Sequence, residues 1–128
     1  MSQIQSILSA NAFFYRAFES RDLVGMGEVW SKGSATLCIH PGRNVLVGWE
    51  AIALSWEQIF QNTPDLAIRT EIKATEIAGD LAYVVVVETV MQVARGRKME
   101  ARSLATNIFE RMAGRWLLIH HHASPILS

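Results

Sequence analysis

The sequence predicts an α+β domain whose sheet is largely antiparallel, and three observations support this prediction. Apolar residues recur at helical spacing in three segments of the first half of the chain. Four strand-like runs follow one another in the second half, and short glycine-containing turns join them as in β-hairpins. The resulting order, α-α-β-β-α-β-β-β-β, is typical of α+β proteins.

The helices are predicted from apolar spacing and from the residues that begin and end them. A first helix is expected over residues 3–19, with Ser2 as its N-cap. Asp22 can cap a second, short helix. A third helix should open at Gly48 and stop at residues 62–64, where a proline disfavours helical backbone in the preceding residue.

The strands are predicted from apolar runs bounded by turn residues. Two short strands, residues 35–40 and 45–47, flank a Pro41-Gly42-Arg43-Asn44 turn. Four longer strands follow over residues 66–78, 81–94, 97–111 and 115–124.

Side-chain alternation divides this sheet into two faces. The predicted hairpin pairings are Glu76 with Tyr83, Val87 with Leu104, and Phe109 with Trp116. The face predicted to form the core carries Ile68, Ile72, Tyr83, Val85, Val87, Arg102, Leu104 and His121. The opposite face carries Glu88 together with Val84, Val86, Ala105, Asn107, Phe109, Trp116 and Leu118. Because this second face is also apolar, we expect a homodimer through it. A single β-bulge would exchange the two faces.

Composition and charge argue against several classes of function. Lysine plus arginine and aspartate plus glutamate number 12 each, so the formal net charge is zero. Binding to nucleic acid or to an acidic membrane therefore has no electrostatic support. No apolar run is long enough to cross a bilayer, and no signal peptide is visible. Cys38 is the only cysteine, so no internal disulfide can form and we expect a cytoplasmic location. The length of the chain predicts a single domain over residues 1–128.

Several landmarks over nearly the whole chain resemble one known family. They are Phe14-Tyr15-Arg16-Ala17, Asp22-Leu23, Val29-Trp30, His40-Pro41-Gly42, Gly48-Trp49-Glu50-Ala51-Ile52, Ser55-Trp56, and Gly114-Arg115-Trp116 running into His120-His121-His122-Ala123-Ser124. Together with the element order, they resemble the SnoaL-like branch of the nuclear-transport-factor-2-like, or ketosteroid-isomerase-like, superfamily. The resemblance implies a cone, in which a curved and mostly antiparallel sheet wraps around three helices and leaves a pocket at the open end. The superfamily includes ketosteroid isomerases, scytalone dehydratases, epoxide hydrolases and polyketide cyclases, so the fold alone selects no activity.

The chain lacks an obvious aspartate base for this pocket. Chemistry of the ketosteroid-isomerase type needs a carboxylate base near the first strand and donors for the developing oxyanion. The three aspartates fall at a helix cap (Asp22), before a strand (Asp65) and in a hairpin turn (Asp80). None of them is expected to reach the pocket. The two aspartates with an arginine between them, on which epoxide hydrolases rely, are also missing.

His40 is the strongest single candidate for a catalytic group. A neutral imidazole can act as a general base near pH 7. A structural role is equally open, in which the ring hydrogen-bonds the turn that follows it. Tyr15 on the first helix resembles a family pocket position and could donate a phenolic hydrogen bond, or it could simply fill the core.

The three consecutive histidines near the end of the chain are not predicted to bind a metal. Alternation along a strand prevents His120, His121 and His122 from converging on one ion. His121 shares the predicted core face with Arg102 and is therefore the pocket candidate. No cofactor is predicted.

The remaining pocket candidates suit a flat and largely apolar ligand. Trp30 and Trp56 could hold its body, or they could belong to the core. Arg102 could bind a carboxylate or phenolate on the ligand, or pair with Glu100.

Two classes of function therefore stay open at this stage. The first is a small-molecule site, either in an isomerase, dehydratase or cyclase that uses histidine acid–base chemistry, or in a binder without catalysis. The second is a protein-association or dimerisation module in which the cone is only a scaffold.

Overall fold

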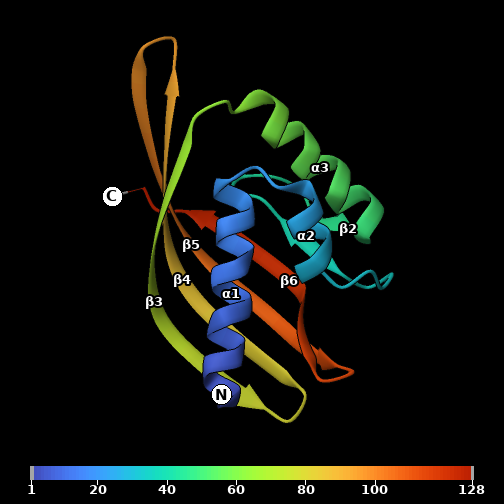
Figure 1. Ribbon diagram of the computed structural model, residues 1–128. Coiled ribbons are helices and arrows are strands. Elements are labelled where there is room, and N and C mark those ends of the chain that lie inside the picture. The colour runs from blue at the N-terminus through green and yellow to red at the C-terminus, as the bar shows by residue number, and fades with distance from the viewer. Residues whose placement is uncertain (1, 128) are drawn as a thin grey trace.

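The computed structural model describes residues 2–127 and contains three helices and a six-stranded sheet within that range. The helices are α1 (Gln3–Glu19), α2 (Leu23–Val29) and α3 (Trp49–Asn62). The strands are β1 (Leu37–Ile39), β2 (Leu46–Val47), β3 (Leu66–Ala78), β4 (Leu81–Ala94), β5 (Arg97–Met112) and β6 (Arg115–Pro125). The predicted order of elements is confirmed, and the four long strands begin at the predicted residues (Figure 1).

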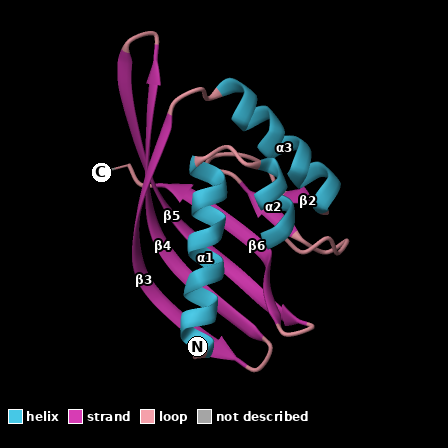
Figure 2. Cartoon of the chain, in the orientation of Figure 1, coloured by secondary structure: helices cyan, strands magenta, loops and turns pink. Residues whose placement is uncertain are grey.

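The sheet is open, curved and mixed. Its strand order is β2-β1-β6-β5-β4-β3, and each neighbouring pair is antiparallel except β1 with β6. The sheet curves around α1, while α2 and α3 lie toward the side of β1 and β2 (Figure 2). The α+β class is the one that the sequence predicts, and the cone is the shape that the family resemblance implies.

Side-chain caps fix where the first two helices begin. The Ser2 hydroxyl accepts from the Gln5 backbone N–H, and the Gln5 side chain accepts from the Ser2 backbone N–H, which completes a capping box. The Asp22 carboxylate accepts from the Gly25 backbone N–H at the start of α2. Both predicted caps are confirmed. The buried stripe of α1 contains Asn11 and Tyr15 among its apolar residues, so two polar side chains face the sheet.

A β-bulge at Lys73 reverses the predicted faces of the sheet. The predicted pairings of Glu76 with Tyr83 and of Val87 with Leu104 are confirmed. However, Ile72 pairs with Val86 and Ala74 with Val85, so Lys73 is a surplus residue on β3. The first half of β3 therefore shares its face with Val86, and not with Val85. The predicted core face was chosen from that half of β3, and the bulge inverts this choice for the remaining strands.

The helix-covered face is consequently the one that was expected to lie outside. Its buried side chains include Val84, Val86, Ala105, Asn107, Phe109, Trp116 and Leu118. The dimer surface predicted from these residues is wrong, because they form the core beneath the helices. The opposite face leaves Tyr83 41% and Leu104 43% exposed. The outer surface of the sheet thus exposes apolar side chains, but they are not those predicted.

A second bulge, on β6, determines which of the three histidines is buried. The predicted pairing of Phe109 with Trp116 is wrong, because Phe109 pairs with Leu118. Beyond this pair, Ile119 is a surplus residue between Leu118 and His120. Beyond the bulge, His121 pairs with Asn107 on the helix-covered face and is only 1% exposed. Its two histidine neighbours therefore point to the opposite side.

The open end of the cone is bounded by α3 and by the ends of the central strands. The Thr63 carbonyl after α3 accepts from the Arg21 side chain, which ties this end to the loop after α1. Within residues 2–127, no helix has both the length and the apolar character needed to span a membrane.

Candidate functional site

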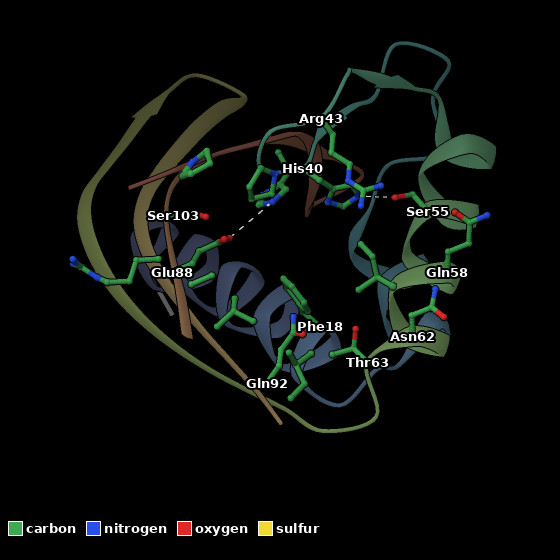
Figure 3. A pocket seen from close by; sticks show the side chains of 18 residues that line it. Phe18, His40, Arg43, Ser55, Gln58, Asn62, Thr63, Glu88, Gln92 and Ser103 are labelled. Carbon is green, nitrogen blue, oxygen red and sulfur yellow. Dashed lines mark hydrogen bonds and ion pairs between the residues drawn. The ribbon is translucent and has the colours of Figure 1, made fainter. Parts of the chain in front are cut away.

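A cavity of about 510 Å³ lies at the open end of the cone. Its polar lining includes His40, Arg43, Ser55, Glu88 and His121 (Figure 3). Its apolar lining includes Phe18, Ile59, Leu66 and Val90. The volume lies in the range of small-molecule sites, and mixed walls with few polar groups are typical of them.

The carboxyl group of Glu88 lies at the floor of this cavity. Glu88 occupies the middle of β4 and is only 3% exposed. Burial raises the pKa of its carboxyl group to about 7, because a charge loses hydration there, although a hydrogen bond from Tyr15 acts in the opposite direction. Sequence reasoning missed this acid because it placed Glu88 on the outer face. The available signal was a single carboxylate within an otherwise uncharged strand.

Tyr15 holds the Glu88 carboxyl group from α1. Its hydroxyl donates to Glu88 Oε2 over 2.6 Å. Burial, followed by the neighbouring Glu88 charge, raises the pKa of Tyr15 well above its ordinary value. Tyr15 therefore remains a phenol and serves as a fixed hydrogen-bond donor.

Asn107 on β5 fixes the tautomer of the buried His121 ring. Its amide nitrogen donates to Asn11 Oδ1 over 2.9 Å and to the Tyr15 oxygen over 3.1 Å. The amide oxygen of Asn107 is left as the acceptor for His121 Nδ1 at 2.5 Å. We infer that His121 carries its proton on Nδ1, because an amide oxygen can only accept.

This tautomer points a bare ring nitrogen toward Glu88. His121 Nε2 lies 3.9 Å from Glu88 Oε2. Burial, followed by the nearby His40, His120 and His122, lowers the pKa of His121 to about 3. Because burial penalises the charged form of both groups, the proton of this pair resides on the Glu88 carboxyl below about pH 7.

His40 and Ser55 form a second polar pair on the opposite wall. His40 Nε2 lies 2.7 Å from the Ser55 hydroxyl oxygen, and the His40 ring meets the Trp56 ring edge-to-face at 4.9 Å. Burial and the nearby Arg43 charge lower the pKa of His40 to about 4, so the imidazole is neutral at pH 7. The Cys38 sulfur lies 3.7 Å from His40 Nε2, and burial raises the pKa of Cys38 to about 12, which leaves it an inert thiol.

The structure places the predicted site residues in three groups. His40 and His121 line the cavity, and Arg102 reaches only its rim. Arg102 pairs with Thr89 and therefore lies on the outer face of the sheet, so the prediction that it shares the core face with His121 is wrong. Tyr15 reaches the cavity indirectly through its bond to Glu88. Neither predicted tryptophan lines the cavity. Trp56 is fully buried behind His40, and Trp30 packs against Phe14 in the core with 6.1 Å between ring centres.

The polar groups do not form a metal site. Among the residues that the structure describes, no group of three or more histidine, cysteine, aspartate or glutamate side chains could hold a metal ion. The arrangement is suited instead to proton transfer, because an acid, a bare imidazole nitrogen and several neutral donors face one apolar space.

The chain matches a known domain family and has the same fold as several solved structures. The model of a SnoaL-like domain family matches residues 7–128. A proposed dehydratase of the NTF2-like family from Streptomyces avermitilis is 26% identical, with a TM-score of 0.91 over 98% of this chain and 97% of that one. A proposed calcium/calmodulin-dependent protein kinase type II association domain from Thiobacillus denitrificans is 30% identical, with a TM-score of 0.84 over 92% and 93% of the two chains.

One curated relative is longer than this chain. The F-box protein SKIP8 of Arabidopsis thaliana is 28% identical over 123 residues, which cover 96% of this chain and 51% of that protein. The chain thus spans about half the length of this relative.

Proposed function

Because the chain belongs to the SnoaL-like domain family, we propose that its cavity binds a small, largely apolar molecule and transfers a proton to or from it. The observation that carries this proposal is the buried Glu88 carboxyl group, whose pKa of about 7 suits an acid or base at neutral pH. The similarity to an NTF2-like dehydratase supports the reaction classes expected from the sequence, namely isomerisation, dehydration or cyclisation.

Each polar group has a defined part in this proposal. Glu88 accepts a proton from the substrate when ionised and donates one when protonated. Tyr15 stabilises the ionised carboxylate by its hydrogen bond. His121 offers its bare Nε2 as a hydrogen-bond acceptor beside Glu88. The paired His40 and Ser55 supply a donor to an oxygen on which negative charge develops.

Kemp elimination tests whether Glu88 acts as a base without requiring the natural substrate. In 5-nitrobenzisoxazole, a base removes the proton from the ring carbon, the nitrogen–oxygen bond breaks, and a coloured cyanophenolate is released. We expect the rate to rise with pH, with a midpoint near the Glu88 pKa of about 7. Glu88→Gln should lower the rate by about a hundredfold or more.

The matched control is Glu76→Gln, which alters an exposed glutamate on β3. This variant should retain the wild-type rate. If Glu88→Gln and Glu76→Gln react equally fast, Glu88 is not the base and the proposed chemistry is refuted.

A second candidate function is self-association without catalysis. The similarity to a kinase association domain and the exposed apolar residues of the outer sheet face favour it. We place the homodimer contact on that face, around Tyr83 and Leu104, instead of on the side chains that form the core. The two functions are compatible, because the outer face lies on the side of the sheet away from the helices.

A further inference from the structure

The charges around the cavity are unbalanced. Besides its two histidines, the charged residues of its lining are Arg43, Arg102 and Glu88, and Arg102 reaches the rim from the outer face of the sheet. Both histidines are neutral at pH 7, because burial keeps the pKa of His40 near 4 and that of His121 near 3. Protonated Glu88 adds no charge, so Arg43 leaves the inner lining positive while Glu88 holds its proton.

Arg43 is the cationic group that lies close to the His40–Ser55 pair. It follows the turn after β1, where its backbone N–H donates to the His40 carbonyl over 3.0 Å. Its side chain extends toward the cavity between His40 and Ser55 (Figure 3). Among residues 2–127, no carboxylate forms a salt bridge with Arg43. The guanidinium group thus faces the cavity mouth with its charge uncompensated by the protein.

We propose that the ligand of this cavity is a small organic monoanion, whose anionic group is held by Arg43 at the mouth while its apolar body extends toward Glu88. This inference rests on the proposed function and names its substrate class. The planar fork of an arginine suits a carboxylate.

The walls between the two ends define the rest of the ligand. Phe18, Ile59, Leu66 and Val90 line the space and offer no charge. A carbon skeleton of small size therefore fits between the arginine and the floor. A second anionic group on the same ligand would meet the Glu88 carboxyl group, which is a reason to expect one charge and not two. A cation would be repelled at the mouth.

Paired ligands test this inference directly. Phenylacetate and its neutral amide, phenylacetamide, have nearly the same size and differ in charge. Isothermal titration calorimetry at pH 6, where Glu88 is mostly protonated, should show phenylacetate binding at least about tenfold more tightly than the amide. Arg43→Met should reduce the affinity for phenylacetate to that for the amide, and should leave amide binding within about twofold.

The control is Arg97→Met, an exposed arginine next to the β4–β5 turn and outside the cavity lining. It should preserve the preference for the anion. Thermal melting of each variant checks that the fold is retained.

The possible results separate this inference from the proposed function. Equal affinity for the two ligands overturns the monoanion inference and leaves an apolar binding cavity intact. A full preference for phenylacetate in Arg43→Met overturns the assignment of Arg43. If neither ligand binds while Glu88-dependent Kemp elimination persists, the inference alone fails. If both binding and elimination are absent, the proposed function fails as well.

Discussion

Replacing Glu88 by glutamine should change the stability of the protein in a way that depends on pH. Burial raises the pKa of the folded-state carboxyl group from 4.5 to about 7, so the folded state binds this proton more tightly than the unfolded state. Stability derived from Glu88 is therefore fully present below about pH 4.5 and is lost as the pH rises to about 7. The shift corresponds to about 3 kcal/mol, and no discount for solvent screening applies because Glu88 is 3% exposed.

Glutamine keeps the shape of the protonated acid and an oxygen that can accept from Tyr15. We expect Glu88→Gln and the wild type to have similar free energies of unfolding at pH 5. At pH 8 the variant should be more stable by about 3 kcal/mol, which corresponds to a melting temperature higher by about 10 °C. Urea denaturation at the two pH values, followed by circular dichroism, measures the difference.

Comparing variant with wild type at each pH cancels the titration of the buried histidines, which acts in the opposite direction. The pKa values of His40 and His121 are lowered, so both favour the folded state more as the pH rises toward 6.5. Glu76→Gln serves as the exposed control and should change stability by less than about 0.5 kcal/mol at either pH. If Glu88→Gln is destabilised equally at pH 5 and pH 8, Glu88 is an ionised partner of His121 and the reasoning above is refuted.

Four further predictions concern the hydrogen-bond network, the rings and the outer face. Tyr15→Phe removes a bond that lowers the pKa of Glu88, so the midpoint of the pH–rate profile in Kemp elimination should move upward; an unchanged midpoint would contradict the role of Tyr15. Asn107→Ala leaves several buried polar groups without a partner and should cost about 3 kcal/mol in urea denaturation, whereas a loss near zero would show that the network relaxes freely. The ring of His40 should stay neutral until the pH falls to about 4, which nitrogen-detected NMR titration can follow, and protonation near pH 6.5 would argue against its burial in solution. Leu104→Lys on the outer face should convert a dimer to a monomer in sedimentation experiments, and a wild type that is monomeric at micromolar concentration would remove the basis for this expectation.

The elements of this fold could be predicted from sequence because local signals mark them. Ser2 and Asp22 cap the first two helices as expected, and glycine-containing turns mark the starts of the last three strands. These signals depend on residues that are close in the sequence. The cone shape itself came from resemblance, and the strand order could not be derived from any local pattern.

The site was predicted less well than the elements, because the β-bulge at Lys73 was not predicted. One surplus residue on β3 inverted the two faces, so Glu88 was assigned to the outside and its acid–base role was overlooked. His121 was expected on the inner face, and the structure places it there only because a second bulge, at Ile119, moves it relative to Leu118. Bulges leave no clear sequence signature in such strands, and each one changes every assignment beyond it.

Arg43 was not predicted as a site residue, for a different reason. A turn residue is read from sequence as part of a connection, and the direction of its side chain depends on how the turn packs against α3. The same applies to Ser55, whose partner His40 lies 15 positions earlier in the chain. Contacts of this kind become visible only when the three-dimensional arrangement of the elements is known.

The bulge at Ile119 also bears on the width of the cavity. If Ile119 were deleted, Leu118 and His120 could keep their partners on β5, and simple alternation would still leave His121 opposite Asn107. Deleting this residue removes the bulge and keeps His121 as the buried ring, so the deletion isolates the effect of the bulge on the shape of β6. A bulge bends its strand and increases its twist, and this one lies where β6 begins to pair with β1. We expect a variant without Ile119 to retain every side chain of the cavity but to hold the two walls of the cavity at a different separation. The size of the ligand that fits would then depend on the length of β6 as well as on the side chains that line the cavity.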